Sequence, residues 1–335
     1  MNSSRPNTVR LQRIARAYRE TGALLAAVKL DLFSKISEGA NTEGLLVNSL
    51  GISELNAERI VVACLGLGLI IRNQEFIENA PDVERFLVKS KSTYAGEWMF
   101  FTHPDWDKWG RLTEFLKDTS PPKLDNNTVK NITLSEARRY HGATFSIGRG
   151  AGRQFLRKVD LAHRTKILDI GGGSGAYCIE ACKKYPKLTA TVLDLPEVTI
   201  IAAEFIESFG LSDRISTLAA DFNFDPFPSD IDVAIMASNL PMYGREAIGR
   251  VIAKAHDALL PGGEMHLIGE ALDCSRDGPA DPAMWGLAQT LNNSTGLAHS
   301  IDECIQYFKT AGFMEVQVNE FIPGVLQRIS AVKKT

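Results

Sequence analysis

The sequence lacks several features that would assign it to a familiar class. It has only five cysteines in 335 residues, and none of them forms a CxxC pair or lies near histidines at zinc-ligand spacing. No stretch approaches the roughly 18 consecutive apolar residues that a membrane-spanning helix needs. The N-terminal residues 1–20 are polar and basic, unlike a signal peptide. These absences predict a cytoplasmic protein with no metal site and no membrane partner.

The chain also lacks a positive charge that would favour nucleic acid. Its formal net charge is −3, so no field over the whole chain attracts a polyanion. Cys178 and Cys182 lie four residues apart on one expected helix. They could hold a metal as two soft ligands, but two buried, reduced thiols are the favoured interpretation, and these suit a cytosolic protein.

The pattern of apolar residues divides the chain into three parts. Residues 1–90 show helical spacing, followed by a short hairpin over 69–79, which is typical of a winged helix. Residues 91–160 are aromatic and irregular and are expected to form a helical linker that contributes to a substrate pocket. Residues 161–335 alternate short apolar strands with amphipathic helices, which predicts an α/β domain with a mostly parallel sheet. The expected strands are Lys166–Ile170, Ala190–Leu193, Ile215–Ala219, Val233–Ala237, Glu264–Gly269 and Glu315–Asn319.

A glycine-rich loop follows the first of these strands. Residues 167–175 read ILDIGGGSG, an apolar strand that ends in an acid and a flexible turn before a helix. Glycine lets the backbone approach a ligand closely. The next strand ends at Asp194, about 20 residues on, where ribose hydroxyls are held in nucleotide-binding folds. The third ends at Asp221 and Phe222, an acid and an aromatic ring suited to adenine. Three successive strand ends therefore indicate one binding site.

Together these motifs resemble those of a known family. DIGGGSG, VLDLP, AADF and ALLPGGEMHLIGE are similar to the motifs of class I S-adenosylmethionine-dependent methyltransferases. The branch resembled is the small-molecule O-methyltransferases of the caffeate and hydroxyneurosporene type. Leu30–Ile36, Leu65–Ile70 and Ala311–Phe313 extend the resemblance over nearly the whole chain. It implies an S-adenosylmethionine cofactor, a small-molecule substrate, and a homodimer formed through the N-terminal winged-helix domain.

The resemblance implies a role for individual residues at the cofactor. The glycines would line its methionine end, the first acid would hold the ribose with the following leucine against the adenine, and the second acid with its aromatic neighbour would enclose the adenine. A serine after the fourth strand would face the cofactor. These cofactor-binding positions are Gly171, Gly173, Asp194, Leu195, Asp221, Phe222 and Ser238.

The chain departs from the family at the residues that accept the proton. The family carries a histidine base in a His-Asp-Trp-like segment, and here Pro241 falls at the histidine and Tyr243 at the tryptophan. The supporting glutamate falls at Ala298. Both halves of the usual base are therefore missing. Since holding an acceptor in line with the methyl group supplies much of the rate, a nucleophilic acceptor needs no strong base.

Three residues remain as candidates for proton transfer. Tyr243 could position or relay a proton, and His299 lies beside the position of the missing glutamate, although it matches a structural arginine of the family. His141 lies where the family's pocket approaches the cofactor. For the substrate pocket, the resemblance implies Asn293. Trp106 and Trp285 suit a flat apolar acceptor, but they could equally be core residues.

Other functions stay open at this level. Oxygen is favoured as the methyl acceptor on family grounds, and an enolisable or electron-rich carbon is the alternative because the base is missing. The chain could also bind the cofactor and catalyse a reaction other than methylation. A winged helix could bind DNA, but the candidate recognition helix Glu54–Leu67 offers Arg59 and otherwise mostly apolar residues, which suit a dimer interface better.

Overall fold

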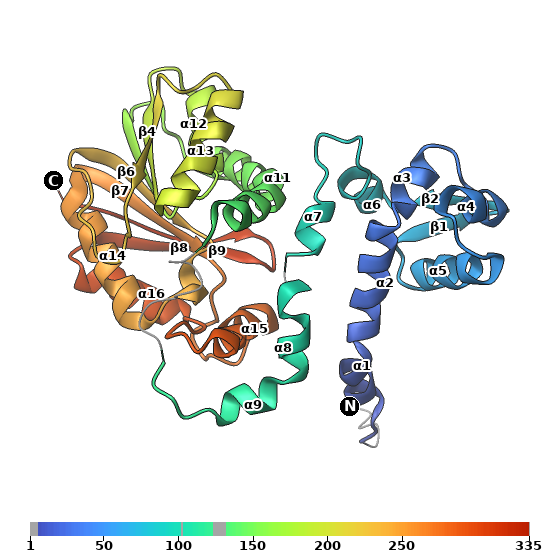
Figure 1. The fold of residues 1–335 in the computed structure, drawn as a ribbon. Coiled ribbons are helices and arrows are strands. Elements are labelled where there is room, and N and C mark those ends of the chain that lie inside the picture. The colour runs from blue at the N-terminus through green and yellow to red at the C-terminus, as the bar shows by residue number, and fades with distance from the viewer. Residues whose placement is uncertain (1–5, 102, 123–131, 335) are drawn as a thin grey trace, which may run out of the picture. The chain divides into compact units, whose positions relative to one another are not determined.

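The computed structural model describes residues 6–101, 103–122 and 132–334 (Figure 1). The chain divides into two compact units, Met1–His103 and Pro104–Thr335. The three-part division expected from the sequence stays a prediction. In the described residues, no helix is long and apolar enough to cross a membrane.

The first unit is helical and carries one hairpin. Ser53 begins its longest helix by accepting a hydrogen bond from the Asn56 amide, a standard N-cap. Strands β1 and β2 pair antiparallel after this helix, as a winged helix requires. The elements of this unit are α1 (Val9–Arg16), α2 (Tyr18–Lys29), α3 (Leu32–Ser37), α4 (Glu43–Leu50), α5 (Glu54–Gly66), β1 (Ile70–Asn73), β2 (Phe76–Asn79), α6 (Pro81–Phe86) and α7 (Gly96–Met99).

The second unit is built on a seven-stranded sheet of order β5-β4-β3-β6-β7-β9-β8. The first five strands in this order are parallel, and β9 is antiparallel to both of its neighbours. The strands are β3 (Lys166–Ile170), β4 (Thr189–Asp194), β5 (Ile215–Ala219), β6 (Ile231–Ala237), β7 (Leu259–Gly269), β8 (Met314–Ile322) and β9 (Leu326–Val332). The expected mostly parallel sheet is confirmed, and β9 was not anticipated.

Helices cover both faces of this sheet (Figure 1). Because side chains alternate along a strand, Ile167 packs with α11, α12 and α13, whereas Leu168 packs with α14 and α16 on the opposite face. The longest helix, α11, begins at a capping box between Thr133 and Glu136. The helices of this unit are η1 (His103–Asp105), α8 (Trp106–Gly110), α9 (Leu112–Lys117), α11 (Leu134–Lys158), α12 (Ala176–Lys184), α13 (Pro196–Ser208), η2 (Leu240–Met242), α14 (Arg245–Ala258), α15 (Ala280–Ala288), η3 (Gln289–Asn292) and α16 (Ile301–Thr310).

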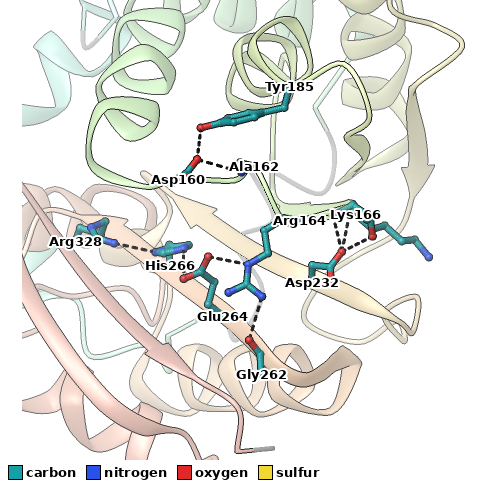
Figure 2. A network of polar contacts seen from close by, with 11 residues as sticks. Asp160, Ala162, Arg164, Lys166, Tyr185, Asp232, Gly262, Glu264, His266 and Arg328 are labelled. Atoms are coloured by element: carbon teal, nitrogen blue, oxygen red, sulfur yellow. Dashed lines mark hydrogen bonds and ion pairs between the residues drawn. The ribbon is translucent and has the colours of Figure 1, made fainter.

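A network of charged residues begins at the amino ends of the parallel strands and extends along β7 (Figure 2). Glu264 lies 3.4 Å from Arg164 Nε and 3.6 Å from His266 Nε2. On the far side of this ring, Arg328 Nη1 lies 3.2 Å from His266 Nδ1. Since arginine can only donate, Nδ1 accepts, and the neutral imidazole carries its proton on Nε2, toward Glu264. The network ties β9 to β7 through side chains as well as through the backbone.

Asp232 joins β6 to the start of β3 in the same region (Figure 2). Its Oδ2 accepts hydrogen bonds from the amides of Thr165, at 2.7 Å, and Lys166, at 2.9 Å. These bonds lower the pKa of Asp232, although burial acts in the opposite direction. The amino end of the sheet is thus held by carboxylates that the protein itself satisfies.

Candidate active site

The glycine loop lies at the opposite, carboxyl end of β3. Gly171 and Gly173 have φ angles of 63° and 57°, a left-handed conformation that favours glycine. A Cβ atom at Gly171 would lie 2.8 Å from Asn239 Nδ2, and one at Gly173 would lie 2.9 Å from His141 Cε1. Both conformation and space therefore require glycine, and the loop forms a cradle that presents backbone rather than side chains.

Asp194 ties the end of β4 to this loop. Its Oδ2 accepts a hydrogen bond from the Gly173 amide and its Oδ1 accepts one from the Leu195 amide, both at 2.8 Å. Burial raises the pKa of Asp194 to about 6, although both hydrogen bonds favour the charged form. Leu195 is the N-cap residue of α13 and is half-buried. The carboxylate is fixed in place, with further lone pairs to accept hydroxyl groups.

A second carboxylic acid lies beneath the loop. It is not among the cofactor-binding residues predicted from the sequence. Asp169 is buried, and the Cys178 thiol donates to its Oδ2 over 3.5 Å. Burial raises the pKa of Asp169 to about 7, and the nearby charge of Asp194 adds to the shift. The residue was visible as the acid that closes the strand in the glycine-rich motif. The sequence could not show that it stays buried.

Asp221 and Phe222 follow β5 and form the side wall of the cradle. Phe222 Cε1 would lie 3.0 Å from a Cβ atom at Gly171, so its ring contacts the loop directly. The Tyr243 ring meets the Phe222 ring edge-on, with 4.9 Å between centroids. Asp221 Oδ1 accepts a hydrogen bond from the Asn223 amide at 2.9 Å, which shapes the turn. The Phe222 ring thus stands beside the glycine loop, in contact with the Tyr243 ring.

The segment after β6 closes the site from the other side. Ser238 has a φ angle of 60° and is exposed, and its amide donates to Ile268 O at 2.8 Å. Its neighbour Asn239 donates from Nδ2 to Gly171 O at 3.2 Å. Asn239, which the sequence-based site also omits, is thus the side chain that holds this segment against the glycine loop. No motif of its own marks it.

Pro241 and Tyr243 lie in the segment at which the resemblance predicts the family's base. Pro241 is buried in η2, and no side chain at that position can take a proton. Tyr243 is also buried; burial raises its pKa, and the charges of Asp194 and Asp221 raise it further. Its hydroxyl therefore stays protonated at neutral pH and can donate a hydrogen bond, but it is a poor base.

His299 supports this segment from behind. Its Nε2 lies 2.9 Å from Tyr243 O and its Nδ1 lies 2.9 Å from Tyr307 Oη. Because a carbonyl can only accept, Nε2 carries the proton, and in the neutral ring Nδ1 accepts from the Tyr307 hydroxyl. The ring is fully buried, which lowers its pKa. Both nitrogens are engaged by protein groups, so the geometry favours a positioning role over the predicted catalytic one.

His141 is brought to the cofactor loop, as the sequence indicated. Its ring lies against Gly173, and burial lowers its pKa to about 4. It is therefore a neutral imidazole at physiological pH, a polar wall rather than a strong base. Its role in catalysis stays a prediction.

One more acid follows β7 beside these groups. Burial raises the pKa of Glu270. The buried Tyr177 hydroxyl lies near enough for the charges of Asp169 and Glu270 to raise its pKa, after the larger effect of burial. The Tyr177 hydroxyl has no hydrogen-bond partner among the described residues. An acceptor from outside the chain would satisfy it.

The predicted substrate residues lie on the segments around α8 and α15. Trp106 begins α8 and is 40% exposed, and Trp285 lies half-buried on α15. Asn293 ends η3 and donates from Nδ2 to Pro121 O at 3.3 Å. The neighbouring Asn292 accepts a hydrogen bond from Lys108, which joins η3 to α8. Their contact with a substrate stays a prediction.

Comparison with known proteins identifies the family of this chain. A family model of the O-methyltransferase domain matches residues 135–314, which include the glycine loop and all the strand ends described above. The chain belongs to the O-methyltransferase family. Members of this family take their methyl group from S-adenosylmethionine, so the predicted enzyme class and cofactor are confirmed. In the described residues, no three or more histidine, cysteine, aspartate or glutamate side chains are grouped to hold a metal.

Individual relatives of this O-methyltransferase cover almost its full length. It is 31% identical to 3-hydroxy-5-methyl-1-naphthoate 3-O-methyltransferase of Streptomyces sahachiroi, over 94% of this chain and 92% of the relative. It is 28% identical to the tetracenomycin polyketide synthesis 8-O-methyl transferase of Streptomyces glaucescens, over 90% of both chains. The structure of human N-acetylserotonin methyltransferase has the same fold, with a TM-score of 0.82, 23% identity and complete coverage of both chains. The expected fold class is thus confirmed.

The residues present fit S-adenosylmethionine. At Gly171 and Gly173 the backbone has a conformation that favours glycine, with no side chain of its own to cover the loop, and Asp194 stands at the end of the next strand. Two buried polar atoms beside the site, Tyr177 Oη and Asn223 Oδ1, have no hydrogen-bond partner among the described residues. These features are what a polar, nucleoside-containing ligand would complete.

Proposed function

We propose that this O-methyltransferase methylates a hydroxyl group of a small aromatic or conjugated metabolite, without a histidine base. The observation that carries the proposal is the buried Pro241, in the segment that closes the cofactor cradle. The two curated relatives described above are named for a naphthoate and for a polyketide, which supports an aromatic acceptor.

The cofactor-binding part of the proposal follows from the strand ends. Gly171 and Gly173 would hold the methionine end, and Asp194 would accept hydrogen bonds from the ribose hydroxyls. Asp221 and Phe222 would enclose the adenine, with Leu195 against it, and Ser238 would face the cofactor. When bound, the cofactor supplies a methyl group activated by a sulfonium. Negative charge on Glu270, which follows β7 at the same end of the sheet, would stabilise that positive centre.

The acceptor side of the proposal rests on the weak basicity of the nearby groups. The pKa of His141 is about 4, and the hydroxyl of Tyr243 stays protonated. Both nitrogens of His299 already have partners. These properties support transfer by proximity to an acceptor that is itself acidic, such as a phenol, with Trp106, Trp285 and Asn293 placing it. In this proposal Tyr243 and His141 orient the acceptor and do not deprotonate it.

We also propose that the enzyme is a homodimer formed through its first unit. Helix α1 buries none of its residues, and the side chains of Leu11 and Ile14, three residues apart, are each more than half exposed. Apolar side chains at helical spacing on an uncovered helix are typical of an interface that a second chain covers.

Titration of S-adenosylhomocysteine into the wild-type enzyme and into Asp194→Ala tests the proposal. Loss of charge-assisted hydrogen bonds is expected to weaken binding at least about tenfold. Release of S-adenosylhomocysteine in assays with phenols of graded acidity then follows methyl transfer, and the more acidic phenols are expected to react without a requirement for base.

Each result of these assays has a clear meaning. Absence of S-adenosylhomocysteine binding to the folded wild type contradicts the proposal. Methylation of carbon acceptors alone, or turnover without S-adenosylhomocysteine release, would favour C-methylation or a non-methylating reaction. Light scattering on the same sample measures the mass, which is expected to be twice the 36.8 kDa of one chain.

A further inference from the structure

Lys254 reaches from α14 into the turn that follows β5. Its Nζ donates a hydrogen bond to Phe222 O at 2.7 Å and another to Asp225 O. The ammonium group also lies 4.3 Å from the centre of the Phe227 ring, a favourable cation–π distance. One half-buried side chain thus contacts three residues of this turn, although Lys254 lies more than 25 residues after them in the sequence.

The turn that Lys254 contacts has no regular secondary structure to hold it. The Asp221 amide donates to Asp225 Oδ2 at 2.7 Å, and the Asp225 amide donates back to Asp221 O at 2.8 Å. These bonds close the turn on itself but do not attach it to the rest of the unit. The two hydrogen bonds from Lys254 attach the backbone of the turn to α14, in addition to the packing of the buried Phe222 ring in the core. Without them, the carbonyl groups of Phe222 and Asp225 would lose a charged donor.

The turn matters because it carries one wall of the cofactor cradle. Phe222 contacts Gly171 on one side and the Tyr243 ring on the other. A displacement of the Phe222 backbone would therefore open the space between the glycine loop and the aromatic pair. Lys254 does not itself contact the cradle, so any effect it has on binding must act through this backbone.

The charges around Lys254 are consistent with a fixed, protonated side chain. Burial lowers the pKa of Lys254, whereas the charges of Asp225 and Asp221 favour its protonated form. Arg250, one turn earlier on α14, acts against them. Protonated lysine supplies three donors, of which two are used for the backbone carbonyl groups.

We propose that Lys254 is a positioning residue for the cofactor: it anchors the Asp221–Phe227 turn so that Phe222 stays against the glycine loop. The inference rests on the proposed function of that loop and adds a residue that no motif or neighbouring strand end indicates. It assigns to α14, a helix on the far side of the sheet from α12 and α13, a direct part in shaping the adenine wall.

The experiment compares Lys254→Met with a matched control. Lys333→Met removes a lysine that also donates to two backbone carbonyl groups, those of Asp257 and Leu259, elsewhere in the same unit. Calorimetric titration of S-adenosylhomocysteine is expected to show about tenfold weaker binding for Lys254→Met and unchanged binding for Lys333→Met. Lys254→Arg, which can donate to both carbonyl groups, is expected to bind within about threefold of the wild type.

Hydrogen exchange in the ligand-free protein provides a readout independent of binding. In Lys254→Met, the hydrogen-bonded amides of residues 221–225 are expected to exchange at least about tenfold faster than in the wild type, with the core strands unchanged. If Lys254→Met does not fold, Lys254→Gln, which keeps one donor group, takes its place, with an intermediate loss expected in both measurements.

The outcomes separate this inference from the proposed function. Wild-type-like affinity and exchange in Lys254→Met, with normal binding by the wild type, overturn the positioning role and leave the function intact. An equal loss of affinity in Lys333→Met also overturns it, since the effect would then be one of general stability. Failure of the wild type to bind S-adenosylhomocysteine overturns the function and, with it, the inference.

Discussion

At the two ends of the parallel sheet, the pKa values of carboxylic acids are shifted in opposite directions. At the carboxyl end, burial raises the pKa of Asp169 to about 7 and that of Asp194 to about 6. Along the network of Figure 2, the pKa of Glu264 is lowered by His266 and the arginines around it, against the effect of burial. The pKa of Asp232 is lowered, also against burial, by hydrogen bonds from the Thr165 hydroxyl and from the Thr165 and Lys166 amides. The same sheet thus holds acids whose pKa is raised and acids whose pKa is lowered, less than one strand length apart.

The difference follows from what the protein supplies to each acid. Glu264 lies within ion-pair distance of Arg164, and Asp232 accepts three hydrogen bonds from Thr165 and Lys166. Within the part of the chain that the structure describes, neither Asp169 nor Asp194 forms an ion pair with lysine or arginine. The acids of the network thus have basic partners or several hydrogen-bond donors that favour their charged form, whereas burial outweighs the hydrogen bonds to Asp169 and Asp194.

The largest expected effect comes from a substitution in the charged network at the amino end of the sheet. Glu264→Gln leaves Arg164 and Arg328 without their shared counter-charge and is expected to lower the free energy of unfolding by about 2 kcal/mol. The control is Glu114→Gln, which breaks an ion pair with Arg111 whose side chains are both 62% exposed, with an expected loss below about 0.5 kcal/mol. Urea denaturation measures both. Equal losses would show that the network contributes no more than a surface pair.

A smaller effect of opposite sign is expected at the carboxyl end. The folded state holds a proton on Asp169 up to about pH 7, whereas the unfolded chain releases it near pH 4, so this acid stabilises the fold at low pH and loses that contribution as pH rises through 7. Asp169→Asn cannot ionise, and is expected to be more stable than the wild type by at least about 1 kcal/mol at pH 8, with the gain absent at pH 4.5.

Asp232→Asn is the matched substitution at the amino end of the sheet. Its lowered pKa means that the ionised form stabilises the fold above about pH 4, so the variant is expected to be less stable than the wild type at pH 8. Thermal unfolding at the two pH values measures both variants. Shifts of the same sign at pH 8 would contradict the difference between the two ends.

The smallest expected effect is the pH dependence of ligand binding. Ribose hydroxyls donate to an ionised Asp194 more strongly than to a protonated one, and its pKa in the free enzyme is about 6. The affinity for S-adenosylhomocysteine is therefore expected to rise several-fold between pH 5 and pH 7.5, as titration at several pH values would show. Asp194→Asn should lose this dependence, and a dependence that persists in the variant would assign it to another group.

The sequence was sufficient for the parallel part of the sheet but not for its antiparallel edge. Strand–helix alternation located five parallel strands within a few residues, except that β7 begins at Leu259, before a Pro-Gly-Gly stretch that reads as a turn. Strand β9 was missed because its buried residues include Arg328 and Ser330. A buried arginine makes a strand look exposed in a hydrophobicity pattern, and only the partner His266 explains its burial.

The residues of the candidate site likewise divide into those that the sequence predicts and those that it does not. Gly173, Asp194 and Phe222 belong to local motifs, and the structure brings them together. Asn239 and Lys254 reach the site through contacts with backbone carbonyl groups of distant residues, which leave no pattern in the sequence. The predicted base His299 shows the opposite case. Its residue type indicated proton transfer, but the hydrogen bonds that its two ring nitrogens form with protein groups could not be predicted.

The position of β9 also affects the order in which the sheet can assemble. Strand β8 precedes β9 in the sequence, yet it pairs only with β9, which lies between β8 and β7. The edge of the sheet therefore remains open at β7 until β9 docks, and β8 can join only afterwards or together with it. Loss of Leu326–Val332 would remove two strands rather than one and expose the unpaired edge of β7, a surface prone to pair with other chains.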